Sequence, residues 1–256
     1  MSVREIPEAL IIAFSMYSII PMPRTEWRSG AMKYALCFLP LVGIIEGIIV
    51  YGMGSFLLGL GLSELLFAAI MSALPIIYSG GIHMDGFLDT CDALGSYGSK
   101  ERRLEIMKDS NSGAFAIIGA LLFGILSIGF YSEIDERVLL FMAFGYPLSR
   151  ALSVLALMFF KGAREGGLAA TFSGAADKGL VRLAMGFYIL LCLSAAFYFS
   201  AAGGMVLLIF SAIAYFLHYY NCMHNFGGIT GDLAGFFLEV YELILLVLLV
   251  VCFRFT

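Results

Sequence analysis

The chain contains 256 residues, of which 61% are hydrophobic and only 13% charged, and its mean hydropathy is +0.95. These values exclude an ordinary soluble domain and predict an all-α integral membrane protein. The net charge of −4 gives no indication of nucleic-acid binding. The five cysteines are scattered and form no Cys-x-x-Cys pair, so we interpret them as small apolar residues rather than as a disulfide framework or a zinc site.

Apolar windows along the chain predict a polytopic bundle of about seven transmembrane helices in one membrane-embedded domain, residues 1–256. A helix needs roughly 20 apolar residues to cross a bilayer. An earlier apolar stretch, Ile6–Ile20, could form an eighth, partly inserted helix. It lacks the charged start and the cleavage site of a signal peptide, so we do not interpret it as one. The spans are expected near Ala35–Leu60, Leu65–Ser79, Ala114–Tyr131, Val138–Phe160, Val181–Ala201, Met205–Tyr219 and Leu233–Phe253.

Basic residues indicate which connections share a side of the membrane, since Lys and Arg are enriched on the cytoplasmic side. The connections after the second and fourth spans are basic, whereas those after the first, third and fifth are neutral or acidic. This pattern predicts a cytoplasmic N-terminus. It also places the polar loops at residues 80–112, 161–180 and 220–232 together on the cytoplasmic face.

The loop after the second span contains the polar segment SGGIHMDGFLDTCDALGS, residues 79–96. Asp85, Asp89 and Asp92 recur at i, i+4 and i+7, so a helix here would project three carboxylates from one face. A bound divalent cation is the usual compensation for such repulsion, and Mg²⁺ is held by one or two carboxylates plus substrate phosphates. The alternative is a solvated loop whose acids balance nearby basic residues. Position favours a site, because His83 and Asp85 directly follow an apolar run.

A basic cluster follows in ERRLEIMKDSNSG, residues 101–113. Arg102, Arg103 and Lys108 could bind phosphate oxygens, the arginines in a bidentate fashion. The cluster could equally serve only to orient the chain in the membrane. Arg164, in the segment AREGG, is a further basic candidate on the same side.

The last span begins with Thr230-Gly231-Asp232 and carries two more acids on the same helix face. Glu239 and Glu242 follow Asp232 at i+7 and i+10. Helix capping by Thr230 or Asp232 would explain one of these polar groups. It would not explain two intramembrane glutamates, which are costly to insert and usually functional.

A further acid, Glu46, lies in the middle of the first span and is expected to be an interior group that could pair with Arg150 in the fourth span. His218 and His224 have no metal-ligand spacing, and a packed or solvated ring is the preferred interpretation of both. The sequence contains no P-loop, no Rossmann glycine pattern and no G-x-S-x-G motif.

Taken in chain order, these motifs closely resemble the cobalamin synthase family, whose activity is adenosylcobinamide-GDP ribazoletransferase. The early segment SMYSIIPMPR is also similar to the N-terminal proline segment of the family, with Tyr17 or Ser18 departing from the usual residues. The first acidic block and the Thr-Gly-Asp block are the most specific parts. The resemblance covers most of the chain and rests on SGGIHMDGFLDTCDALGS, ERRLEIMKDSNSGAFA, PLSRAL, AREGGL and GGITGDLAGFFLEVYE.

The resemblance implies the substrates adenosylcobinamide-GDP and α-ribazole or its 5′-phosphate. The products would be adenosylcobalamin, or its 5′-phosphate, and GMP, in the last steps of cobalamin biosynthesis. It further implies a requirement for Mg²⁺ and a place in a prokaryotic cytoplasmic (inner) membrane, with the active-site loops facing the cytoplasm. A homo-oligomer, or contact with other cobalamin-assembly enzymes, is compatible with this assignment.

Transfer from a diphosphate requires neutralised charge on the bridging and leaving oxygens and a positioned alcohol nucleophile. On this basis the three aspartates of the acidic loop would bind Mg²⁺, and the basic cluster would neutralise the departing GMP. Asp232, with Glu242 or Glu239 behind it, would complete the metal site or accept the proton of the ribazole hydroxyl, for which His83 is a second candidate. The metal candidates are Asp85, Asp89, Asp92 and Glu239, the catalytic candidates Asp232, His83 and Glu242, and the substrate-binding candidates Arg102, Arg103, Lys108, Arg164 and Thr230.

Two alternative classes are other membrane transferases that act on a diphosphate and use Asp-rich motifs with Mg²⁺, and transporters. A CDP-alcohol phosphotransferase normally shows Asp-Gly-x-x-Ala-Arg, from which residues 85–90 diverge after the glycine, and a prenyltransferase usually has two Asp-x-x-x-Asp motifs. A cation or metabolite transporter would be expected to place ionisable groups at several depths and to break helices near mid-membrane. Here the acids cluster at loop ends on one side, which favours chemistry at the interface.

Overall fold

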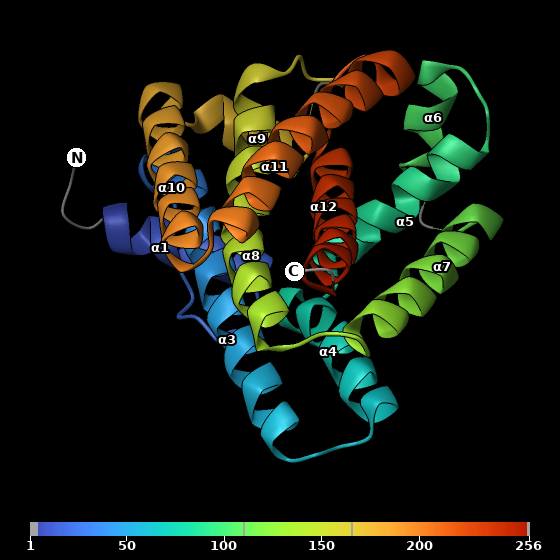
Figure 1. Cartoon of the computed structure of the whole chain (residues 1–256). Helices are drawn as coiled ribbons and strands as arrows, with labels where there is room; N and C mark the ends of the chain where they lie inside the picture. Colours follow the sequence, from blue (N-terminus) through green and yellow to red (C-terminus); the bar gives the residue numbers. More distant parts are fainter. Residues whose placement is uncertain (1–4, 110, 165, 255–256) are drawn as a thin grey trace.

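The computed structural model describes residues 5–109, 111–164 and 166–254, which form an all-helical bundle (Figure 1). The all-α fold predicted from composition is confirmed. A short 3₁₀ segment, Leu36–Phe38, precedes α3, and a π-helical segment, Cys222–Phe226, follows α11. The α-helices are α1 (Glu5–Tyr17), α2 (Ser29–Ala35), α3 (Leu39–Gly59), α4 (Glu64–Ser79), α5 (Ile82–Gly95), α6 (Lys100–Ile106), α7 (Ala114–Tyr131), α8 (Glu136–Phe159), α9 (Leu168–Ala175), α10 (Lys178–Phe199), α11 (Ala201–Asn221) and α12 (Gly231–Arg254).

Six helical stretches in the described residues are long and apolar enough to cross a membrane, and the bent pair α4–α5 makes a seventh if it counts as one span. The expected limits agree with the helices to within a few residues, except in the first span. There, α2 and the 3₁₀ segment extend the helical stretch back to Ser29. The N-terminal apolar stretch forms the separate helix α1, which ends at Tyr17, ahead of Pro21 and Pro23.

A bend of 98° separates α4 from α5. Gly80 and Gly81 both adopt positive φ, 65° and 78°, a conformation that side-chain-bearing residues adopt only with strain. Their amides donate hydrogen bonds to the carbonyls of Ile77 and Ile76 and close the end of α4. The bend allows α5 to leave the direction of α4 and to lay its polar segment against α12.

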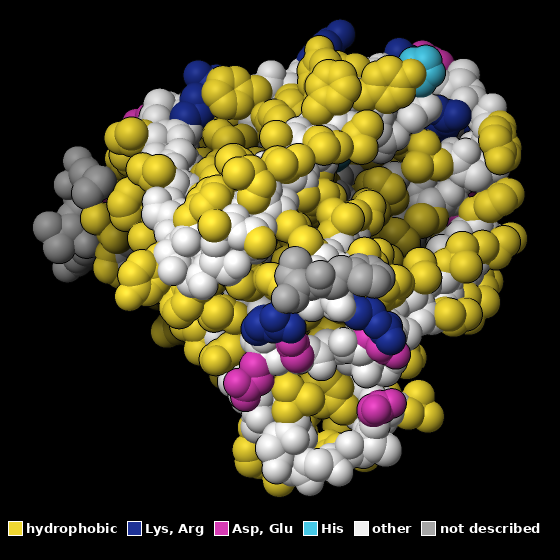
Figure 2. Space-filling model, in the orientation of Figure 1, with side chains coloured by type: hydrophobic (Ala, Val, Ile, Leu, Met, Phe, Trp, Pro, Cys, Tyr) yellow, Lys and Arg dark blue, Asp and Glu magenta, His cyan; other side chains and the backbone are white. Residues whose placement is uncertain are grey.

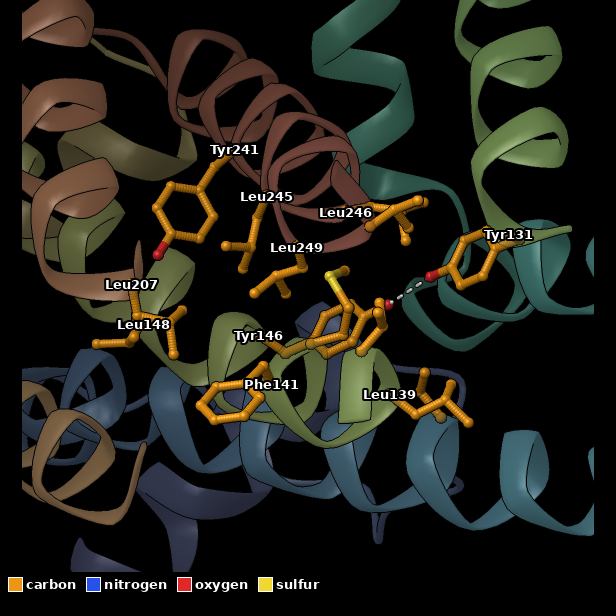
Figure 3. Packing of buried hydrophobic residues seen from close by; sticks show 14 of the residues in the cluster. Tyr131, Leu139, Phe141, Tyr146, Leu148, Leu207, Tyr241, Leu245, Leu246 and Leu249 are labelled. Carbon is orange, nitrogen blue, oxygen red and sulfur yellow. Dashed lines mark hydrogen bonds between the residues drawn. The ribbon is translucent and has the colours of Figure 1, made fainter. Parts of the chain in front are cut away.

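Helix α8 is the most buried span: 78% of its apolar window is inside the protein, against 22% for α7 and for α10. Helix α3 approaches it closely, since a Cβ on Gly47 would collide with the carbonyl oxygen of Ala143. On its other face, Tyr146 of α8 packs with Tyr241 and the leucines of α12 (Figure 3). The hydroxyls of Tyr146 and of Tyr131 on α7 are hydrogen-bonded at 3.2 Å. The close approach of α3 and α8 at Gly47 is typical of helix association in lipid.

The outward faces of the peripheral helices are apolar. Leu121 on α7 and Leu183 on α10 are 60% and 72% exposed. Figure 2 shows hydrophobic side chains over most of the visible face, with charged side chains gathered towards its upper edge and its lower end. A continuous apolar surface of this size is expected of a protein that lies in a bilayer.

The polar connections meet at one end of the bundle, which contains α6 and α9. The turn between α3 and α4 lies at the other end (Figure 1). The segment after α8 pairs with the segment before α12: the Ile229 amide donates to the Lys161 carbonyl (2.8 Å), and the Ala163 amide donates to the Ile229 carbonyl (3.0 Å). The Lys100 ammonium donates to the Met223 carbonyl at 3.0 Å and ties α6 to the π-helical segment. The three loops predicted to share a face therefore do meet.

Candidate active site

Helices α5 and α12 pack backbone against backbone at this polar end. A Cβ on Gly86 would lie 2.7 Å from the carbonyl oxygen of Asp232 and 2.9 Å from its Cα. Across the same contact, a Cβ on Gly235 would lie 3.1 Å from the carbonyl oxygen of His83. A larger residue at Gly86 would push the backbone of Asp232 away. The glycine therefore allows the polar face of α5 to lie directly against the first turn of α12.

This contact brings acids from the two helices together. The three aspartates predicted to lie on one helix are all in α5. Asp89 is half-buried and interacts electrostatically with Asp85, Asp92 and Asp232, as well as with Arg164. The Arg164 guanidinium donates to the Asp232 carboxylate at 3.0 Å. It therefore offsets part of the negative charge of the cluster.

Thr230 builds the start of α12, as the capping interpretation predicts. Its Oγ1 accepts a hydrogen bond from the Leu233 amide at 3.2 Å and lies 3.5 Å from the Asp232 carboxylate. The side chain is buried, so its hydroxyl is engaged in the fold. Asp232 lies in the first turn, where the partial positive charge of the helix end stabilises an anion.

Two cavities share a wall at Gly231 and Asp232. The first, which we call the Arg164 cavity, has a volume of about 320 Å³ and lies between the segment after α8, α9 and the start of α12. The second, the His83 cavity, has a volume of about 300 Å³ and lies between α1, α5, α8 and α12. Asp85 lines the His83 cavity. Asp232 is thus accessible to ligands from two sides, and Asp85 from one.

His83 is buried, and its Nε2 has no hydrogen-bond partner within the described residues. Its ring stacks on Tyr17 of α1, with ring centroids 5.8 Å apart and planes inclined by 14°. Buried polar atoms are nearly always hydrogen-bonded, so an unpartnered one beside a cavity indicates a contact that a ligand can complete. The structure therefore places His83 beside the acidic cluster, as the sequence prediction requires.

Asp92 has a different environment from the other two aspartates of α5. Its carboxylate accepts hydrogen bonds from the backbone amides of Gly113 and of Ala116, the latter at 2.9 Å. It thus caps the N-terminus of α7, where an anion is favoured. Asp85 and Asp89 carry no such bond within the described ranges, which leaves their oxygens available.

The donor set at this site fits Mg²⁺ by its chemistry, because carboxylate oxygens are its preferred protein ligands. In the part of the chain that the structure describes, no three His, Cys, Asp or Glu side chains converge closely enough to hold a metal ion by themselves. Mg²⁺ is commonly held by one or two carboxylates together with waters and substrate phosphates. Asp85 and Asp89, whose carboxylates are not engaged elsewhere, are the residues that suit this arrangement.

The basic residues of α6 do not line either cavity. Arg103 donates to the Asn225 side-chain oxygen at 2.6 Å and holds α6 against the π-helical segment. Arg102 is exposed and pairs with Glu105 at 3.1 Å, and Lys108 is exposed. The structure does not bring these three predicted phosphate ligands to Asp232.

The two glutamates of α12 lie elsewhere too. Glu239 and Glu242 follow Asp232 by seven and ten residues, which is roughly 10 to 15 Å along the helix at about 1.5 Å per residue. Neither lines the Arg164 cavity or the His83 cavity. The structure therefore separates them from the cluster that they were predicted to complete.

A buried charge network engages Glu242 instead. Its carboxylate accepts hydrogen bonds from Arg150 Nη1 at 2.6 Å and from the Ser149 hydroxyl at 2.7 Å. The other arm of Arg150 donates to Glu46, so the predicted Glu46–Arg150 pair is confirmed. We call Glu46, Arg150 and Glu242 the Arg150 network; it links α3, α8 and α12 and is almost completely buried.

Several residues on the cavity walls were not among the predicted site residues, Tyr17 and Lys178 among them. Tyr17 lines the His83 cavity, and Lys178, at the start of α10, lines the Arg164 cavity. From the sequence alone, Lys178 was only one of the basic residues of the loop at residues 161–180, and Tyr17 was only part of the N-terminal proline segment. Since each comes from an element far from α5 and α12 in the chain, no local pattern could have assigned them.

Comparison with known proteins adds a family to this geometry. A family model described as cobalamin-5-phosphate synthase matches residues 9–250. A relative from Lachnoclostridium phytofermentans, named adenosylcobinamide-GDP ribazoletransferase, is 44% identical over 238 residues, 92% of this chain and 90% of the relative. A relative with the same name from Clostridium botulinum is 31% identical over 93% of this chain and 94% of the relative. Another, from Pseudomonas savastanoi, is also 31% identical, over 89% of this chain and 90% of the relative. No solved structure matches.

Proposed function

Since the chain belongs to the cobalamin-5-phosphate synthase family and is a transferase, we propose that it transfers adenosylcobinamide phosphate from adenosylcobinamide-GDP to α-ribazole or its 5′-phosphate. The products are then adenosylcobalamin, or its 5′-phosphate, and GMP. The observation that carries this proposal is the junction at Asp232, where the aspartates of α5, the Arg164 guanidinium and two cavities meet. A two-substrate reaction needs such a junction.

In this reaction the acceptor's hydroxyl oxygen forms a bond to the phosphorus that carries the cobinamide. The bond from that phosphorus to the bridging oxygen breaks, and the bridging oxygen leaves on GMP. The acceptor's proton passes to a base. The protein mainly positions the groups and stabilises the developing charge.

The described residues supply these functions as follows. Asp232, fixed by Arg164 and by the capped start of α12, is the proposed base. Arg164 and Lys178 attract the phosphate oxygens. Asp85 and Asp89 would hold Mg²⁺, which when bound neutralises charge on the diphosphate.

The remaining candidates have weaker or indirect roles in this proposal. Arg102, exposed on α6, and Lys108, exposed just after that helix, would attract the part of the nucleotide that extends beyond the Arg164 cavity. Asp92 holds the start of α7, and Glu242 holds α12 through Arg150. The basic connections favour a cytoplasmic position for this end of the bundle, in a prokaryotic inner membrane.

The test is GMP release by the purified protein in detergent, from adenosylcobinamide-GDP and α-ribazole, with and without Mg²⁺. We expect release only when the acceptor and Mg²⁺ are both present, and a loss of at least about 100-fold in Asp89→Asn. Asp135→Asn is the matched control: Asp135 caps α8 at the opposite end, and asparagine is an equally good cap. Release that needs no acceptor, or full activity in Asp89→Asn, would contradict the proposal.

A further inference from the structure

The two cavities that meet at Asp232 have walls of different chemistry. The Arg164 cavity offers the guanidinium of Arg164, the ammonium of Lys178 and the hydroxyl of Ser173. Arg164 Nη1 is buried and has no hydrogen-bond partner within the described residues, while Nη2 is paired with Asp232. Unused cationic donors of this kind suit the oxygens of a phosphate.

The His83 cavity is instead mainly apolar and aromatic. Its acidic side chains are Asp85 and the shared Asp232, and its hydroxyl side chains are Tyr17 and Ser153. Among the residues that the structure describes, no Lys or Arg lines it. A phosphate in this cavity would meet carboxylates and no lysine or arginine side chain, so it could be held only at the Asp85 end, through Mg²⁺, and not against the rest of the wall. The wall consists largely of Met16, Tyr17, Leu39, Ile82, His83 and Leu238.

His83 supplies this cavity with a polar group of defined orientation. Stacking on Tyr17 fixes the plane of the imidazole. Its Nε2 has no hydrogen-bond partner within the described residues. A neutral imidazole can donate one hydrogen bond and accept another. Apolar walls with one oriented polar group are the usual lining of a site for a flat, largely apolar ligand.

We infer that the His83 cavity binds the aromatic base of the acceptor nucleoside, with His83 hydrogen-bonded to a ring nitrogen, while the Arg164 cavity binds the phosphate end of the nucleotide donor. This assignment rests on the proposed function. It places the acceptor's ribose at the shared wall of Gly231 and Asp232, where its hydroxyl can lose its proton to Asp232 as the oxygen bonds to phosphorus. His83 is then a residue for recognition of the acceptor, and Asp232 remains the base.

The experiment measures binding of each ligand separately to the full-length protein in detergent by calorimetry, with α-ribazole as one probe and GDP as the other. His83→Phe keeps a ring against Tyr17 and removes the nitrogen. Lys178→Met removes a cation from the Arg164 cavity. The matched control is His224→Phe, because His224 also stacks on a tyrosine, Tyr220, at 5.1 Å, but is exposed and lines neither cavity.

We expect His83→Phe to weaken α-ribazole binding by about tenfold or more, the effect of losing one buried hydrogen bond, and to leave GDP binding unchanged. Lys178→Met should weaken GDP binding and spare α-ribazole. In steady-state assays, His83→Phe should raise KM for α-ribazole and leave kcat at saturation near the wild-type value. His224→Phe should change none of these quantities.

Unchanged α-ribazole affinity in His83→Phe, or an equal loss of affinity for both probes, would overturn the assignment. A fall in kcat at unchanged KM would also overturn it and would make His83 the base. If His83→Phe is not monodisperse, Tyr17→Leu replaces it in the binding measurement. This variant removes the ring that orients the imidazole and should likewise weaken α-ribazole binding without changing GDP binding. Failure of the wild type to release GMP would instead refute the proposed function, so the two failures are distinguishable.

Discussion

Helix α12 carries acids in two regions that look alike in sequence and differ in structure. Asp232, in the first turn, faces two cavities and shares its surroundings with the aspartates of α5. Glu242, almost three turns later, accepts hydrogen bonds from Arg150 and Ser149 on one carboxylate oxygen and is buried in the bundle. An acid in a transmembrane helix is thus no sufficient sign of catalysis. Both acids have an arginine partner, but Asp232 lines two cavities, whereas Glu242 is buried and lines neither of them.

The physical difference lies in the compensation of charge. The guanidinium of Arg150 contacts Glu46 and Glu242 and lies over the Tyr146 ring at 5.7 Å, so it neutralises charge within the protein. In the cluster around Asp232, Arg164 is paired with one acid, and Asp85 and Asp89 are left for an external cation. The four predictions below test this contrast, from the largest expected effect to the smallest.

Arg150→Met should cause the largest loss of stability. It leaves Glu46 and Glu242 buried without their counter-charge, which typically costs about 3–5 kcal/mol. The measurement is the unfolding midpoint in detergent by fluorescence-detected size exclusion. Arg137→Met, which breaks an exposed pair with Asp135, should cost less than about 1 kcal/mol. Equal midpoints for the two variants would remove the contrast.

Gly86→Ala should disturb the acidic cluster without changing any charge. Its Cβ would meet the backbone of Asp232, which cannot turn aside, and overpacking of this kind costs about 1–3 kcal/mol. We expect GMP release to fall together with the unfolding midpoint. Gly129→Ala on α7 is the control, because nothing lies within 4 Å of its added Cβ and alanine favours a helix. A fully active Gly86→Ala enzyme would show that the α5–α12 contact does not position Asp232.

Asp92→Ala separates a cap from a metal ligand. Loss of the two hydrogen bonds from the start of α7 should cost about 0.5–2 kcal/mol of stability. The Mg²⁺ concentration at half-maximal GMP release should stay at the wild-type value, in contrast to Asp85→Ala. A marked shift of that concentration in Asp92→Ala would return Asp92 to the metal site that its spacing predicts.

Arg102→Ala should have the smallest effect. Its pair with Glu105 is exposed, and such pairs contribute less than about 1 kcal/mol. Nearby, hydrogen bonds from Asn111, and to a lesser degree the charge of Arg102, hold the pKa of Asp109 below its usual range. We expect KM for adenosylcobinamide-GDP to rise less than about fivefold, measured at two salt concentrations. A larger rise would show that α6 closes over the nucleotide.

The sequence alone determined the parts of this protein that depend on local composition. Long apolar windows predict membrane helices because an unpaired backbone is too costly in lipid, and the expected spans agree with the helices. The spacing of Asp85, Asp89 and Asp92 would place three carboxylates on one face if the segment were helical, and the segment is the helix α5. The Glu46–Arg150 pair could also be foreseen, because a buried acid in an apolar span requires a partner and few cations are available.

Only the tertiary structure decided which of these groups share a site. The bend at Gly80 and Gly81 directs α5 onto α12, and this contact brings Asp89 towards Asp232 from a distant part of the chain. The same packing carries Asp92 to the start of α7. Tyr17 and Lys178 reach the cavities from other helices. Such contacts follow from how closely helices can approach across glycines, a property of pairs of surfaces that no single segment contains.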